Sequence, residues 1–110
     1  MSEAGEQSAF VQYVEWRGFP IFHVPNGGSR NAIEAANLKR QGVRAGVPDL
    51  CIPVARKGFH GLYIEMKTRT GRVSENQKRW LELLNANGYR AEVAKGYDAA
   101  VRIFEDYVKE

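Results

Sequence analysis

The feature that most constrains the fold is a pair of β-rich segments joined by a short connection with two glycines. The first segment covers residues 49–54, the connection is "ARKGFHG", and the return segment covers 61–67. Consecutive strands with so short a link pair antiparallel. A helix predicted over 75–87 and a strand over 90–95 follow, and a strand–helix–strand unit favours parallel pairing through a right-handed crossover. The sequence therefore predicts one sheet that contains both strand orientations.

The rest of the chain supplies helices for both faces of this sheet. We predict a helix over 3–17, a short strand over 21–24, a short helix over 31–42 with a thin apolar stripe, and a final helix capped by Asp98. The order αβαββαβα predicts an α/β protein with a small mixed β-sheet flanked by helices. With 110 residues, of which 44% are apolar and 26% charged, we expect a single domain over residues 1–110.

Composition argues against several classes of protein. No apolar run approaches the roughly 18 residues of a membrane span. The N-terminus has no basic segment followed by an apolar one, so no secretory signal is visible. A single cysteine, Cys51, cannot form an internal disulfide and is predicted to be a small buried hydrophobe. We therefore expect a cytoplasmic protein without a membrane partner.

The charge of the chain favours a polyanionic partner, because the net charge is +3 and the pI about 9.2. The basic residues fall in short runs on both sides of one acidic pair. Each run taken alone is more often a solvated surface, but their bracketing of the acids makes that interpretation weaker and favours contacts with the phosphates of a polyanion. The predicted DNA-binding residues are Lys39, Arg40, Arg44, Arg69, Arg72, Lys78 and Arg79.

The return strand carries an acid and an amine on one face. In "LYIEMK" (62–67), apolar residues alternate with Tyr63, Glu65 and Lys67. An antiparallel hairpin brings Asp49, at the start of the first strand, beside Glu65 and Lys67. Two close carboxylates repel unless a cation lies between them. Their oxygen atoms suit Mg²⁺ or Mn²⁺, which can activate water for attack on a phosphate.

This spacing predicts a minimal set of groups for phosphodiester hydrolysis, in which Lys67 orients water or stabilises charge on the phosphate. A simpler interpretation explains the spacing equally well. Asp49 could cap a turn after Pro48, and Glu65 with Lys67 could form an exposed pair of small energetic value.

Longer stretches of the sequence distinguish the two interpretations. "PD" at 48–49, followed by a hairpin and "EMK" at 65–67, resembles the motif of the PD-(D/E)XK nuclease superfamily. The stretches "HVPNGGSR", "LKRQGVRAGVPDL", "GLYIEMKTRTGRVSENQKRWLELLNANGY" and "VAKGYDAAVRIFEDY" together resemble the VRR-NUC family of virus-type replication-repair nucleases, from about residue 6 to 107. The resemblance implies a restriction-endonuclease-like core and a metal-dependent endonuclease.

The resemblance also implies roles for individual residues. Asp49 and Glu65 would bind Mg²⁺ or Mn²⁺, with the backbone carbonyl of Met66 as a further ligand. Lys67 would be the catalytic lysine. Gln77 matches a glutamine near the active site of the family, and it fits a capping box with the serine at position 74 equally well.

The family further places an acidic residue of its first helix near the metal. Glu6 is the preferred match for this ligand and Glu3 the alternative. A solvated glutamate in the first turn, favoured by the helix dipole, explains either residue at least as well. The choice between Glu6 and Glu3 stays open at this point.

Short family members that stand alone tend to act as homodimers on branched DNA such as four-way (Holliday) junctions. The resemblance thus implies a structure-selective endodeoxyribonuclease of DNA repair that cuts a junction or a flap, in a phage or a bacterial cell. A small chain that grips a two-fold branched substrate also suggests a two-fold dimer. The alternative is a non-catalytic DNA-binding module that has kept the nuclease fold, although binding alone does not need two carboxylates facing a polyanion.

A few residues lie outside this set. Trp16, Trp80 and Tyr89 are predicted as core residues first and as base-stacking platforms second. Gly42 and Gly46 either let the backbone bend close to the strand that begins at the acid or act as ordinary turn glycines. Neither histidine has a partner at metal-ligand spacing, so both are expected to pack or lie at the surface.

Overall fold

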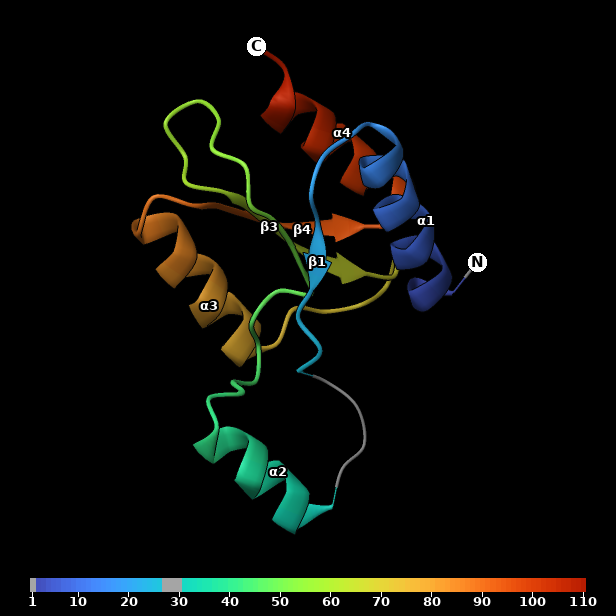
Figure 1. Cartoon of the computed structure of the whole chain (residues 1–110). Coiled ribbons are helices and arrows are strands. Elements are labelled where there is room, and N and C mark those ends of the chain that lie inside the picture. The colour runs from blue at the N-terminus through green and yellow to red at the C-terminus, as the bar shows by residue number, and fades with distance from the viewer. Residues whose placement is uncertain (1, 27–30) are drawn as a thin grey trace.

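The computed structural model describes residues 2–26 and 31–110, and this part of the chain forms four helices and four strands (Figure 1). The order αβαββαβα confirms the predicted order of elements. In chain order the elements are α1 (Glu3–Trp16), β1 (Phe22–His23), α2 (Ala32–Arg40), β2 (Leu50–Ile52), β3 (Leu62–Lys67), α3 (Glu75–Ala86), β4 (Arg90–Lys95) and α4 (Tyr97–Val108).

The four strands form one mixed sheet in the order β1-β2-β3-β4. β2 and β3 pair antiparallel with Leu50 opposite Ile64, and β3 and β4 pair parallel with Leu62 opposite Arg90. Both pairings confirm the prediction from the sequence. At the tip of the β2–β3 connection, Lys57 and the glycine after it both have positive φ, as tight hairpin turns require. β3 therefore lies inside the sheet, with one antiparallel and one parallel neighbour.

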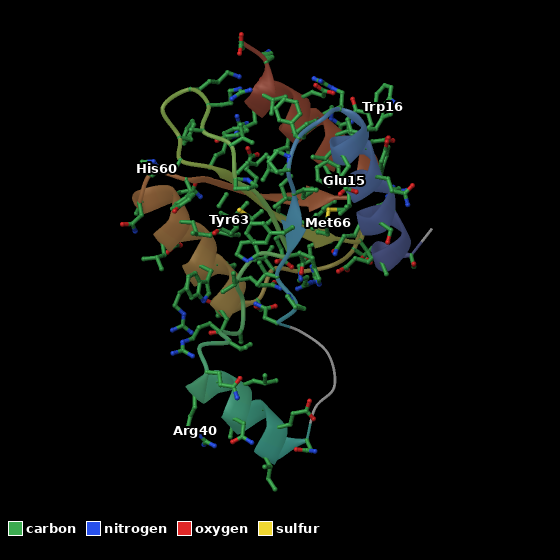
Figure 2. All side chains as sticks on the ribbon, viewed as in Figure 1. Glu15, Trp16, Arg40, His60, Tyr63 and Met66 are labelled. Carbon is green, nitrogen blue, oxygen red and sulfur yellow. The ribbon has the colours of Figure 1, made fainter. Side chains whose placement is uncertain are left out.

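Helices cover both faces of the sheet, as predicted. α1 and α4 pack together on one face, and α3 lies on the other (Figure 1). Figure 2 shows Met66 on the side of α1 and Tyr63 on the side of α3, as the alternation of a strand requires. The core under α1 and α4 is fully buried, with Phe10 and Phe104 edge to face at 6.2 Å between ring centroids. The apolar half of β3 anchors this core, and its polar half faces α3.

α2 stands apart from the body of the molecule (Figure 1). None of the residues of α2 is buried, which agrees with the thin apolar stripe in its sequence. Asn31 caps its start by accepting the N–H of Glu34 at 2.7 Å. Arg40 lies at its last turn and points away from the sheet in Figure 2. Within residues 2–26 and 31–110, no helix is both long and apolar enough to cross a lipid bilayer.

Two predictions about this fold were wrong. The cap of α4 is Gly96 with φ 97°, not Asp98, because the helix begins one residue before Asp98. The first backbone N–H, that of Tyr97, is instead satisfied by a carboxylate from α1. Trp16 does not lie in the core, since it is 79% exposed at the end of α1 (Figure 2).

Candidate active site

Glu65 is the one charged side chain among the buried residues that the structure describes, at 3% exposure in the middle of the sheet. It lies on β3, and its side chain points toward α3. The side chains of its apolar neighbours in the strand point to the other face of the sheet. Burying a charged carboxylate is costly unless another group compensates its charge. An exposed ion pair, the simpler interpretation of the sequence, therefore does not describe Glu65.

Asp49 lies beside Glu65, as the hairpin predicted. It directly precedes β2, and the antiparallel register that pairs Leu50 with Ile64 brings it opposite Glu65. Its Oδ2 accepts the backbone N–H of Met66 at 2.9 Å, which ties the start of β2 to the end of β3. The two acids thus share one site on one sheet face.

Lys67 completes the acidic pair with a cation. Its Nζ lies 3.7 Å from Oε2 of Glu65, and its side chain is 15% exposed. The two residues are separated by one position on β3, so they lie on the same face of the strand. An ammonium so well shielded from water interacts with Glu65 more strongly than an exposed pair would.

Gln77 links α3 to the same carboxylate. Its Nε2 donates to Oε2 of Glu65 at 3.0 Å, while its Oε1 accepts the backbone N–H of Ser74 at 2.9 Å. Oγ of Ser74 accepts the N–H of Gln77 in return, which closes the capping box. The two interpretations of Gln77 that the sequence left open are therefore satisfied together, because each end of the amide serves one of them.

The surroundings of Glu65 change its acidity. Burial and the negative charge of Asp49 raise the pKa of Glu65 to about 7, and the ammonium of Lys67 opposes the rise. The carboxyl group is therefore poised to gain or lose a proton near neutral pH. Strongly shifted pKa values of this kind cluster at functional sites.

The donor chemistry of this site fits a small divalent metal. Two carboxylates meet on one face of the sheet, and the backbone carbonyl of Met66 belongs to the same stretch of β3. All of these candidate ligands are oxygen atoms, which Mg²⁺ and Mn²⁺ prefer. A cation between the acids would relieve the repulsion that raises the pKa of Glu65. Among the residues described, no group of three or more His, Cys, Asp or Glu side chains gathers. The protein would thus supply few ligands, as Mg²⁺ sites often do.

The acids of α1 lie near this site but make other contacts. Oε1 of Glu6 accepts the backbone N–H of Tyr97 at 3.1 Å, so the carboxylate caps α4. This contact lies at the Lys67 end of the sheet, because the N–H of Gly96 donates to the carbonyl of Lys67 at 3.1 Å. Glu3 and Asp49 instead line the same shallow hollow. The metal-binding role of Glu6 stays a prediction, and the geometry brings Glu3 toward Asp49.

The residues predicted to bind DNA are all exposed and lie on three segments. The structure brings three of them, Lys39, Arg44 and Arg79, around one hollow between α2 and α3. The first segment is the end of α2 with the loop after it, the second precedes α3, and the third is the first turns of α3. They hold, in this order, Lys39, Arg40 and Arg44; Arg69 and Arg72; and Lys78 and Arg79.

Sequence reasoning missed two residues that hold the chain leading into Asp49 and β2. Nδ1 of His23 lies 2.9 Å from the carbonyl oxygen of Asp49, to which it donates, and 3.2 Å from Nε2 of Gln7. Asn26 donates to the carbonyl oxygens of Arg44 at 2.8 Å and of Val47 at 3.1 Å. These bonds hold the segment before β2 across separations of 18 to 26 residues, for which the local sequence carries no signal.

The mixed sheet and the acids on its central strands define the class of protein, an α/β domain of the PD-(D/E)XK nuclease type. The family model of the VRR-NUC domain matches residues 1–98. A solved "VRR_NUC domain protein" is 34% identical, with 98% of this chain and 88% of that chain covered and a TM-score of 0.86. A solved "VRR_NUC domain" is 20% identical over 96% of each chain with a TM-score of 0.67, a likeness of fold alone.

A comparison with curated proteins finds no significant match. The match of the family model over most of the chain nevertheless confirms the resemblance seen in the sequence. The chain belongs to the VRR-NUC family of nucleases, which is generally metal-dependent.

Proposed function

We propose that this protein is a metal-dependent endodeoxyribonuclease that cuts phosphodiester bonds in branched DNA, a four-way junction or a flap. The observation that carries the proposal is the buried carboxyl group of Glu65 beside Asp49 and Lys67. Such an arrangement does little for the stability of the fold, because the two acids repel each other and Glu65 is shielded from water. It is a suitable device for holding a divalent cation next to a phosphate.

Each residue of the site has a distinct task in this proposal. Asp49 and Glu65 hold Mg²⁺ or Mn²⁺ together with the carbonyl of Met66. When bound, the ion polarises the phosphoryl oxygens and activates water. Lys67 places its positive charge where negative charge develops on the phosphate. Gln77 fixes the orientation of Glu65 through the 3.0 Å hydrogen bond, as outer-shell partners of metal ligands commonly do.

The basic residues on α2, the following loop and α3 supply contacts with the DNA backbone. Backbone contacts position DNA without reading its sequence, so they support selectivity for shape. A second copy of the chain would double this surface, and a two-fold dimer matches a two-fold branched substrate. We propose that such a homodimer acts in the cytoplasm of a bacterial or phage-infected cell. Light scattering that shows only monomers at working concentrations would contradict the dimer.

The cleavage proposal is tested by Glu65→Gln, with the exposed Glu82→Gln on α3 as the matched control. Both variants and the unmodified protein are incubated with linear duplex, flap, fork and four-way junction DNA, in Mg²⁺, in Mn²⁺ and after metal removal. We expect Glu65→Gln to abolish cleavage and Glu82→Gln to retain it, with cleavage lost when metal is removed. Undiminished cleavage by Glu65→Gln would refute the proposal, and salt-dependent DNA binding without cleavage by any form would favour the non-catalytic alternative.

A further inference from the structure

A hollow of about 580 Å³ opens between α2, the loop that follows it and the first turns of α3. Figure 1 shows α2 and α3 on the two sides of this region. The volume lies within the range of roughly 300 to 1,000 Å³ that small-molecule sites occupy. Its lining is half apolar and half polar or basic: Ala35, Leu38, Val43, Ala45 and Trp80, with Asn26, Lys39, Arg44, Asn76 and Arg79. We call it the α2–α3 pocket.

The charge of the α2–α3 pocket is of one sign. Its described lining contains three cations and no acid. Nη1 of Arg44 donates to the carbonyl of Lys39 at 2.6 Å, and Nη2 of Arg79 donates to Oδ1 of Asn76 at 3.0 Å. These acceptors are neutral, and each guanidinium has five N–H donors. The two arginines are thus held in place with positive charge left for an anionic ligand.

The apolar part of the pocket includes a large aromatic ring. Trp80 on α3 is half-buried, so it is only partly the core residue that the sequence predicted, and the rest of its side chain lines the pocket. A nucleotide combines a base, whose apolar face stacks on an indole, with a phosphate that nearby cations can bind. A free phosphate would not need the apolar lining, and an apolar peptide would not need three cations.

The pocket lies next to the acidic pair. Its lining residue Asn76 directly precedes Gln77, which holds Glu65. On the other side, the loop that contributes Ala45 leads directly into Asp49. The two walls approach closely, because a Cβ added to Gly46 would lie 2.6 Å from the backbone carbon of Asn76. A nucleotide in the pocket would therefore continue into DNA that reaches the site.

We propose that the α2–α3 pocket binds one unpaired nucleotide of the DNA substrate, with its base on Trp80 and its phosphates on Lys39, Arg44 and Arg79. The inference rests on the proposed function, since it assumes a DNA substrate. It gives that function a source of selectivity. A base within an intact duplex is stacked on both sides and cannot enter, whereas an unpaired nucleotide at a flap or branch can.

Trp80 itself reports on the pocket. The sequence contains two tryptophans, so Trp16→Phe leaves Trp80 as the only indole. Binding is followed by tryptophan fluorescence in Ca²⁺, under conditions where a gel shows no cleavage. The two DNAs are a blunt duplex and the same duplex with an unpaired flap. We expect the flap to quench Trp80 and the blunt duplex to leave it unchanged. Saturating flap DNA without any change in emission would overturn the inference.

A second measurement uses substitutions of Trp80. Trp80→Leu removes the stacking surface and should weaken flap binding about 5- to 150-fold relative to blunt duplex, the effect of losing one base–aromatic stack. Trp80→Phe keeps a ring and should restore most of this loss. Equal weakening for both DNAs would overturn the inference. The two proposals can fail independently. Quenching of Trp80 without cleavage would contradict the nuclease activity alone, and cleavage without quenching would contradict the nucleotide site in the pocket alone.

Discussion

The side chain of Gln77 donates to Oε2 of Glu65 at 3.0 Å, and this bond joins α3 to the buried acid of the central strand. The same amide closes the capping box of α3 through Ser74. The start of α3 is therefore built around the acid. Any change that moves this helix start should move the carboxylate as well.

The first prediction separates the two tasks of Gln77. Ser74→Ala removes the hydrogen bond that Oγ of Ser74 accepts from the N–H of Gln77, and it leaves the bond from Gln77 to Glu65 in place. Gln77→Ala instead removes the two bonds of the Gln77 amide, one to Glu65 and one to the N–H of Ser74. We expect each variant to lose about 0.5 to 2 kcal/mol of unfolding free energy, the usual value of an N-cap. Cleavage should fall roughly 10- to 100-fold further in Gln77→Ala, as for other partners of metal ligands. Urea denaturation and single-turnover cleavage measure the two effects, and equal cleavage by both variants would contradict the prediction.

The second prediction concerns the stability of the metal-free protein at different pH values. Because the pKa of Glu65 is raised to about 7 when folded, the folded chain keeps a proton that the unfolded chain releases near pH 4.5. The free energy of unfolding should therefore fall between about pH 4.5 and pH 7, by up to roughly 3 kcal/mol, and level off above that range. Glu65→Gln has no such proton, so its denaturation profile should lack this fall. Parallel profiles for the two proteins would show the prediction wrong.

The third prediction compares two glycines with positive φ. Gly42 (φ 107°) has open space around it, whereas a Cβ on Gly46 (φ 94°) would lie 2.6 Å from the backbone of Asn76. Gly42→Ala should lose about 1 to 2 kcal/mol from the left-handed backbone alone. Gly46→Ala should lose more, and it should also reduce cleavage because the loop before Asp49 must move. Similar losses in thermal denaturation would mean that the close approach has no energetic consequence.

The fourth prediction concerns the acids of α1. Oε1 of Glu6 accepts the N–H of Tyr97, so Glu6→Gln should lower the unfolding free energy by about 0.3 to 1 kcal/mol through a weaker interaction with the α4 dipole. Glu3 makes no such contact among the described residues and shares a hollow with Asp49. Glu3→Gln should therefore lose no more than the contribution of a first-turn carboxylate to the α1 dipole, up to about 1 kcal/mol, and it should weaken metal-dependent cleavage. A Glu6→Gln variant with normal stability and lost metal dependence would assign the metal role to Glu6 instead.

Much of the fold followed from local spacing. The antiparallel hairpin, the alternation in β3 and the Ser74–Gln77 capping box all depend on neighbours in the chain, and all are found in the structure. The connection of the hairpin covers residues 53–61, which is longer than the predicted 55–61. The position of Asp49 beside Glu65 followed too, because an antiparallel hairpin brings the start of its first strand beside the end of its second. The ends of elements followed less closely, since the predicted strand 49–54 is shortened to Leu50–Ile52. Pro53, which has no N–H for the ladder, follows its last residue.

The sequence by itself determined the order of elements, the pairing of the central strands and the acids that they bring together, because these depend on periodicity and short-range geometry. Only the tertiary structure decided that Glu65 is buried enough to titrate near neutral pH, that Gln77 serves two partners, and that Glu6 caps a helix 91 residues away. It also decided that Trp80 lines a basic hollow. The physical reason is common to all of these: desolvation and contact between distant segments depend on how layers pack, and no local pattern of residues encodes that packing.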